Sequence, residues 1–188
     1  MKQKKEEGLG YFRMRLFIAL NFNELRDYFS GLQKQIPKED AKLTFPKDFH
    51  LTLKFLGEVE DSKVDEIKKL FSEIRFNEFE AKITTIGVFT EQFLRTIWIK
   101  AEADEINNLQ KQIDEKLISL FKEEKNFEPH ITLARVKFVK DKKPFLERLK
   151  SIKTEEKAVR INNFELIKST LMPEGPVYEV LGTFPKPL

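Results

Sequence analysis

Residues 50–57 read HLTLKFLG, and residues 130–133 repeat the start of this segment as HITL. In both places polar and apolar residues alternate, which is the pattern of a β-strand with one buried face. Side chains two positions apart in a strand point to the same face. We therefore predict that each strand buries its leucine and isoleucine side chains and presents a histidine and a threonine on the opposite face.

Each of these tetrads is preceded by a segment whose apolar residues recur at helical spacing. The predicted helices cover residues 24–35, with Asn23 as the N-cap, and residues 104–121. The tetrads lie 80 residues apart, too far for a solenoid repeat. We predict two half-domains related by pseudo-twofold symmetry, with one tetrad from each half facing a shared cleft.

The rest of the chain supplies further strands and helices. Strands are predicted over residues 14–20, 79–89, 94–101, 158–167 and 176–184, and helices over residues 61–74 and 144–152, with Pro144 at the first helical position. Because helices do not follow strands one for one, antiparallel pairing is favoured over a parallel sheet. The predicted fold is α+β and bilobal, with antiparallel sheets flanking a central cleft and helices on the outside. A single domain is expected over residues 14–188, after a polar extension over residues 1–13.

Composition excludes several kinds of site. The chain has no cysteine, which excludes disulfides, thiolate nucleophiles and thiolate metal ligands. Its two histidines leave a zinc site short of nitrogen ligands. We therefore expect neither a metal nor a cofactor.

Charge and hydropathy patterning indicate the compartment. The 34 basic and 31 acidic residues nearly balance, so most charge is expected on a mixed, solvated surface. No apolar run approaches the roughly 20 residues that span a bilayer, and the Lys/Glu-rich first ten residues lack the apolar core of a secretion signal. A cytoplasmic protein without membrane contact is the expectation.

The two His–Thr dyads, His50/Thr52 and His130/Thr132, together suit chemistry at phosphorus. Histidine titrates near pH 6.5, so one imidazole can accept a proton from water while the other donates one to a leaving oxygen. Threonine hydroxyls can donate hydrogen bonds to the phosphoryl oxygens as charge develops there. A single His-x-Thr is more often packing or surface than catalysis. With ten threonines in the chain, chance places Thr two positions after both histidines roughly once in a few hundred sequences.

Four segments carry a resemblance to a known family. They are RLFIAL at 15–20, FHLTLKFLG at 49–57, PHITLAR at 129–135 and GPVYEVL at 175–181. Over residues 14–184 the chain resembles the LigT-like RNA 2',3'-cyclic phosphodiesterases, historically called 2'-5' RNA ligases. The resemblance implies a bilobal α+β fold, hydrolysis of RNA 2',3'-cyclic phosphate to a 2'-phosphate end, and reversible 2'-5' joining of RNA ends. The expected partners are RNA ends with a cyclic phosphate, tRNA fragments among them, and the expected state is a monomer.

The resemblance also assigns roles to the two histidines. It implies that His50 is the proton donor and His130 the proton acceptor. Geometry inferred from the sequence cannot choose between them, because the two halves are nearly equivalent.

Four more residues are candidates for substrate binding. Arg135 matches an arginine that holds phosphate in the family, with a surface arginine as the alternative. Strict alternation from His130 points it away from the cleft unless a strand end or bulge intervenes. Lys54 shares the parity of His50 and Thr52, so it is a candidate for meeting phosphate, with a solvated surface lysine as the alternative. Phe17 and Tyr178 are candidates for stacking on a base, with core packing the favoured interpretation for Phe17.

Two other functions remain open. One is a related two-histidine phosphodiesterase acting on another small cyclic or 2'-5' phosphodiester, because the tetrads specify the bond and not the rest of the substrate. The other is a non-catalytic protein that binds RNA ends. Two titratable histidines favour turnover, since phosphate capture alone would not require them.

Overall fold

The computed structural model describes residues 12–39 and 41–185. Residues 1–11 of the predicted extension lie outside this part of the chain, and Arg13, which was assigned to the extension, begins the first strand. Among the helices of the described ranges, none is long and apolar enough to cross a membrane.

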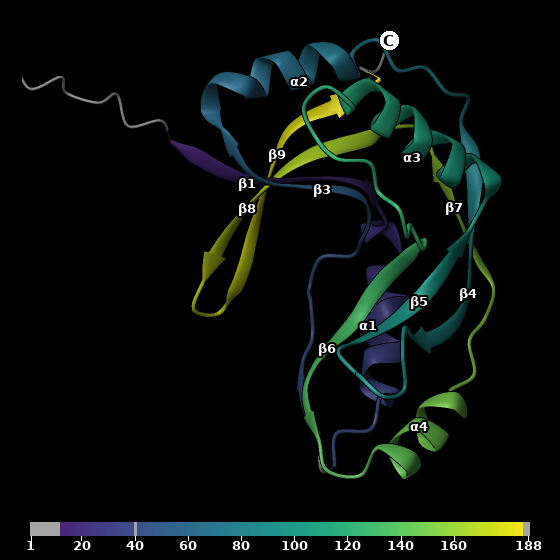
Figure 1. Ribbon diagram of the computed structural model, residues 1–188. Coiled ribbons are helices and arrows are strands. Elements are labelled where there is room, and N and C mark those ends of the chain that lie inside the picture. Colours follow the sequence, from purple (N-terminus) through teal and green to yellow (C-terminus); the bar gives the residue numbers. More distant parts are fainter. Residues whose placement is uncertain (1–11, 40, 186–188) are drawn as a thin grey trace, which may run out of the picture.

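The strands form one sheet in which every pairing is antiparallel (Figure 1). The order is β7-β4-β5-β6-β3-β1-β8-β9, and β2 also pairs with β6. The strands are β1 (Arg13–Asn21), β2 (Ala41–Thr44), β3 (His50–Glu60), β4 (Phe79–Val88), β5 (Thr96–Glu102), β6 (His130–Val139), β7 (Lys157–Ile161), β8 (Phe164–Met172) and β9 (Gly175–Phe184). The structure therefore confirms the α+β class with antiparallel pairing.

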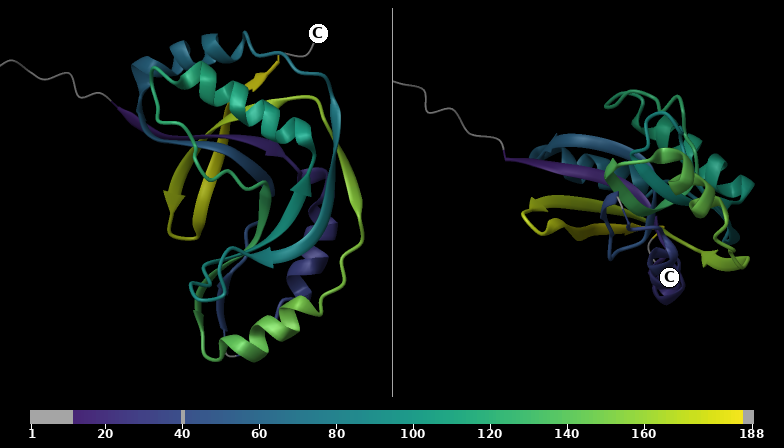
Figure 2. Two further views of the ribbon diagram at one scale, coloured as in Figure 1. Left: turned by 45° about the vertical axis from the view of Figure 1, so that its right-hand side comes forward. Right: turned by 90° about the horizontal axis from the view of Figure 1, so that it is seen from below.

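The sheet consists of two halves that meet where β3 lies beside β6. One half contains β3, β1, β8 and β9, and the other contains β6, β5, β4 and β7. Between β3 and β6 the only residues in register are Leu51 and Ile131. The two lobes seen in Figures 1 and 2 are thus joined at the two histidine-bearing strands.

In the part of the chain that the structure describes, four helices cover the lobes, and two of them cover the lobe opposite to their own place in the sequence. They are α1 (Arg26–Gln35), α2 (Val64–Phe71), α3 (Asp104–Leu117) and α4 (Lys142–Lys150). The helix before the first tetrad, α1, packs on β6, whereas the helix before the second, α3, packs on β3 and against α2. This exchange keeps the pseudo-twofold relation and binds the lobes together. The core between the sheet and these helices is rich in phenylalanine, and five of its largest fully buried side chains are Phe22, Phe29, Phe49, Phe71 and Phe164.

The strand predicted over residues 158–167 is two strands in the structure. Asn162 and Asn163 interrupt it, so that β7 pairs with β4 in one lobe and β8 pairs with β1 in the other. The short strand β2 was not predicted, and it adds to the edge of β6.

Two helix starts also differ from the prediction. The first helix opens with a 3-10 turn, and the Asn23 Oδ1 atom accepts the backbone N–H of Phe49 (2.9 Å) in place of capping the helix. Asn23 thereby holds the residue that enters β3. Helix α4 begins at Lys142 with Asp141 as its N-cap, because the Asp141 carboxylate accepts the N–H of Lys143 (3.3 Å), so Pro144 is not its first residue.

Candidate active site

Both His–Thr dyads lie on one face of the sheet at the junction of the lobes. In β3 and β6 the four dyad residues are half-buried, while Leu51, Leu53, Ile131 and Leu133 between and beyond them are buried. Residues directly opposite each other in an antiparallel pair have their side chains on the same face. Because Leu51 is opposite Ile131, the flanking histidines and threonines of both strands point to the other face. The alternation predicted from the sequence is therefore present.

Each tetrad ends in a β-bulge, at the same place in both halves. In the first, Thr52 is opposite Ala19 and Lys54 is opposite Ile18, so Leu53 is the extra residue. In the second, Thr132 is opposite Trp98 and Ala134 is opposite Ile97, so Leu133 is the extra residue. An extra residue shifts the alternation by one position. After each bulge, the first residue is therefore buried and the second is exposed.

The second bulge brings Arg135 to the dyad face. Arg135 is exposed and lines a cavity of about 340 Å³ together with His50, Thr132 and Tyr178. The remaining walls come from residues 44–48 and 174–177 and from Met172. One member of each dyad, His50 and Thr132, is thus part of this cavity wall, whereas Thr52 and His130 are not.

The first bulge turns Lys54 the other way, and the prediction that it shares the face of His50 and Thr52 is wrong. Its side chain is 3% exposed and forms an ion pair with Asp114 of α3, which is 7% exposed. The Lys54 ammonium also donates to the backbone carbonyl of Lys122 (2.6 Å). Lys54 is therefore unavailable to a phosphate at the dyads. The residue that takes the place of Arg135 in the first half is Phe55, which is 65% exposed.

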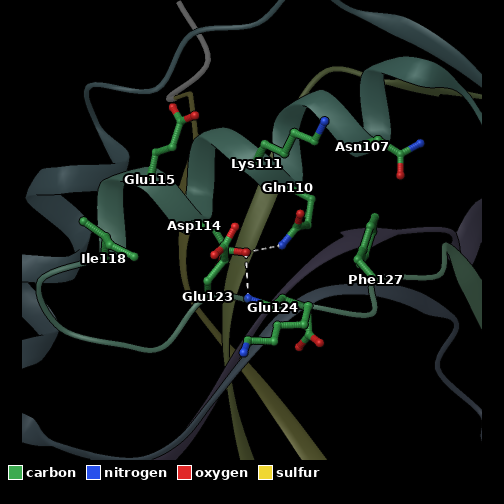
Figure 3. Close-up of a pocket in the computed structure, with 10 residues that line it drawn as sticks. Asn107, Gln110, Lys111, Asp114, Glu115, Ile118, Glu123, Glu124 and Phe127 are labelled. Atoms are coloured by element: carbon green, nitrogen blue, oxygen red, sulfur yellow. Dashed lines mark hydrogen bonds between the residues drawn. The ribbon is translucent and has the colours of Figure 1, made fainter.

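Asp114 lies under a second cavity, of about 520 Å³, between α3 and the segment that follows it (Figure 3). The cavity is larger than the one at His50, but neither histidine lines it. Its walls carry both acidic and basic side chains, and the Asp114 carboxylate already accepts hydrogen bonds from Gln110 (2.6 Å) and the N–H of Glu124 (2.9 Å). The smaller cavity, which His50 and Thr132 line, is therefore the candidate active site.

The imidazole of His50 lies against two aromatic rings. Its ring centroid is 5.0 Å from that of Phe17 and 5.2 Å from that of Tyr178. Phe17 is 3% exposed, so its ring packs against His50 within the protein and offers no surface on which a base could stack. The expectation that Phe17 stacks on a base is therefore wrong, and the alternative of core packing holds. Tyr178 is half-buried and lines the cavity, and burial raises the pKa of its hydroxyl.

The electrostatics of this pocket disfavour a charged His50 in the free protein. Burial lowers the pKa of His50 to about 4, and the nearby Arg135 cation and His130 add to this, while Asp48 opposes it. His50 is therefore neutral at pH 7 unless a bound anion changes its surroundings.

His130 differs from His50 in having a fixed hydrogen bond. Its Nδ1 atom lies 2.7 Å from the backbone carbonyl oxygen of Glu128. A carbonyl can only accept, so Nδ1 carries the hydrogen, and in the neutral ring Nε2 keeps its lone pair. The ring also meets Phe89 edge to face, with centroids 4.8 Å apart. Sequence reasoning missed this asymmetry between the histidines, because a backbone carbonyl leaves no mark in the residue type.

Within residues 12–39 and 41–185, no group of three or more His, Asp or Glu side chains is placed to hold a metal ion.

The depressed pKa of His50 predicts a loss of stability in mild acid. The folded protein binds this proton only near pH 4, whereas an unfolded histidine binds it near pH 6.5. The stabilisation is therefore fully present above pH 6.5 and is lost as the pH falls towards 4. Between pH 7 and 4.5 we expect the free energy of unfolding to drop by roughly 2–3 kcal/mol more in the wild type than in His50→Asn. Urea unfolding of both proteins at the two pH values measures this difference, and equal losses would contradict it.

Comparisons with known proteins agree with this arrangement. The family model for LigT-like phosphoesterases matches the chain twice, over residues 20–98 and 97–178. A Methanocaldococcus jannaschii protein named RNA 2',3'-cyclic phosphodiesterase is 37% identical over 172 residues, which cover 89% of this chain and 98% of the relative. A Thermotoga maritima protein of the same name is 34% identical, covering 89% of this chain and 93% of the relative.

Solved structures show the same fold. A crystal structure of a Thermus thermophilus protein superposes with a TM-score of 0.74 at 29% identity, covering 91% of this chain and 97% of the other. Escherichia coli LigT in complex with 3'-AMP superposes with a TM-score of 0.72 at 22% identity, covering 92% and 97%.

Proposed function

The chain belongs to the LigT-like phosphoesterase family, and from this we propose that it hydrolyses RNA 2',3'-cyclic phosphate ends to 2'-phosphate ends without a metal. The observation that carries the proposal is the Leu51–Ile131 pairing, which places both His–Thr dyads on one face at the junction of the lobes. The names of the relatives support the substrate, and the chemistry of the dyads supports the reaction.

We assign His130 as the proton acceptor. Its Nδ1–H is held by the Glu128 carbonyl, so the neutral ring presents Nε2 to a water molecule. As the water oxygen bonds to phosphorus, its proton passes to His130. The fixed tautomer supports the same role that the family resemblance implies.

We assign His50 as the proton donor. The bond between phosphorus and the 3' oxygen breaks in the same displacement, and His50 gives this oxygen its proton, which leaves a 3'-hydroxyl and a 2'-phosphate. His50 is neutral in the free protein, so the role requires the cyclic phosphate anion to raise its pKa on binding, as an opposite charge in a poorly solvated site does. Exchange of one proton with water at each histidine restores the starting state.

The other polar groups of the site have supporting roles in this proposal. Thr52 and Thr132 donate hydrogen bonds to the non-bridging phosphoryl oxygens, and the Arg135 guanidinium neutralises their charge. Tyr178 forms a wall of the cavity for the terminal nucleoside. In 2'-5' joining, the 5'-hydroxyl of a second RNA end takes the place of water. The participation of tRNA fragments, the monomeric state and the cytoplasmic location stay predictions.

The proposal predicts one product. A short oligonucleotide with a 2',3'-cyclic phosphate should be converted to the 2'-phosphate alone, at a rate that EDTA and added Mg²⁺ leave unchanged. Chromatography against authentic 2'- and 3'-phosphate standards identifies the product, and an oligonucleotide with a 3'-phosphate is the inert control. A 3'-phosphate product, or loss of activity in EDTA that a metal restores, would contradict the mechanism.

The same assay separates the alternatives. Turnover of a small cyclic or 2'-5' phosphodiester with no turnover of the oligonucleotide would favour a related phosphodiesterase. Tight binding of the cyclic end without any product would favour a protein that binds RNA ends.

A further inference from the structure

The buried ion pair between Lys54 and Asp114 connects the first histidine strand to the segment that precedes the second. Lys54 belongs to β3, four residues after His50, and Asp114 belongs to α3. The bulge at Leu53 turns Lys54 away from the dyads and towards this helix. Both side chains are more than nine-tenths buried. A buried charge is tolerated only when it has a partner and when its other hydrogen-bonding positions are filled. In this pair, backbone groups of the segment that follows α3 fill some of those positions.

The pair holds two backbone groups of residues 118–129, which join α3 to β6. The Lys54 ammonium donates to the carbonyl oxygen of Lys122 (2.6 Å), and the second Asp114 oxygen accepts the N–H of Glu124 (2.9 Å). Figure 3 shows Asp114 pointing from the helix towards Glu124, with Gln110 donating to the same carboxylate. Burial opposes the charge of Asp114, but these hydrogen bonds outweigh it and lower the pKa of the carboxyl group.

The same segment ends at the group that orients His130. The Glu128 carbonyl, four residues beyond Glu124, accepts from the His130 Nδ1–H (2.7 Å). The next carbonyl, that of Pro129, accepts the N–H of Ala101 in β5 (3.4 Å). The segment is thus fixed by the ion pair at 122 and 124 and by β5 at 129. The Glu128 carbonyl lies between these anchors.

We infer that Lys54 and Asp114 are positioning residues, which hold residues 122–128 so that the Glu128 carbonyl keeps His130 in the Nδ1–H tautomer. This rests on the proposed role of His130 as proton acceptor. A histidine in the other tautomer would direct a hydrogen, not a lone pair, from Nε2 at the water, and it could not accept the proton. A lysine from the first half of the protein thereby helps to set the tautomer of the histidine in the second half.

The experiment uses the fact that the chain has only two histidines. In a His50→Asn background, long-range ¹H–¹⁵N NMR spectra of the imidazole at high pH report the tautomer of His130 alone. The test variant is Lys54→Met/Asp114→Leu, which removes both buried charges together and so leaves neither unpaired. The control is Lys116→Met/Glu73→Gln, which removes a surface ion pair (2.7 Å) between Lys116 of the same helix and Glu73, just beyond the end of α2.

We expect the control to keep the Nδ1–H tautomer and the test variant to show a mixture with the Nε2–H form. With His50 present, the test variant should lose kcat by roughly ten- to a hundredfold, while KM changes little, because the phosphate-binding groups stay in place. A folded test variant with an unchanged tautomer would overturn the inference. If the wild type proves inactive on cyclic ends, the proposed function fails, yet the tautomer spectra still decide whether the ion pair positions His130.

A second variant leaves the ion pair intact. Glu124→Pro removes the N–H that Asp114 accepts and also the Glu124 carboxylate, which accepts the N–H of Asn126 (3.4 Å). Glu124→Ala, which loses the carboxylate but keeps the N–H, is therefore one control. Lys125→Pro is the other, since no acceptor for the Lys125 N–H is found in the described ranges. Glu124→Pro should shift the tautomer and neither control should. An equal response of Glu124→Pro and either control would also overturn the inference, and this holds even if the double substitution prevents folding.

Discussion

Replacing His50 or His130 with alanine is expected to remove most of the hydrolysis of a 2',3'-cyclic phosphate end, and replacing both is expected to cost little more. Each single variant should lose about a hundred- to ten-thousandfold in kcat, because one proton transfer is missing from a displacement that uses both. Groups that act in one step give losses that do not add. Single-turnover rates of the three variants, with circular dichroism to show that each is folded, measure this.

The threonines provide the matched comparison. Thr52→Ala and Thr132→Ala each remove one hydrogen bond to developing charge and leave both proton transfers, so their losses should be smaller, on the order of ten- to a thousandfold. A His50→Ala protein that hydrolyses the cyclic end at nearly the wild-type rate would exclude the mechanism.

Lys54→Met alone is expected to destabilise the protein more than Lys54→Met together with Asp114→Leu. The single substitution leaves the Asp114 carboxylate buried without its cation, which costs about 3–5 kcal/mol in the free energy of unfolding. The double substitution removes both charges, and an apolar pair of similar volume is often close to neutral in such a position. Urea unfolding of the two variants gives the comparison. A double variant less stable than the single would show that the carboxylate does not need its cation.

The sequence predicts the dyads well because a strand without irregularities has a strict period of two. The alternation around His50 and His130 correctly places the intervening leucine and isoleucine in the core and the dyads on the other face. The order of helices and strands likewise predicts the α+β class, since both depend on local spacing.

The prediction of which face a side chain lies on fails where a β-bulge adds one residue to a strand. Lys54 and Arg135 come after the bulges at Leu53 and Leu133, so counting from the histidines places each on the wrong face. Nothing in the residue type of a leucine marks it as the extra one. The prediction of one strand over Ala158–Ile167 also fails, because the apolar alternation shifts by one position at Asn162 and Asn163, where the chain passes from one lobe to the other.

The crossing of the chain between the lobes has a consequence for its synthesis. The strands β1 and β3 are synthesised early and can pair with each other. The other edge of β1 pairs with β8, whose first residue lies about 100 positions after the end of β3. At roughly 5–20 residues per second, this leaves β1 with an open edge on the nascent chain for on the order of ten seconds. Because Tyr178 of β9 forms a wall beside His50, a growing chain has no complete site until almost all of it has been made.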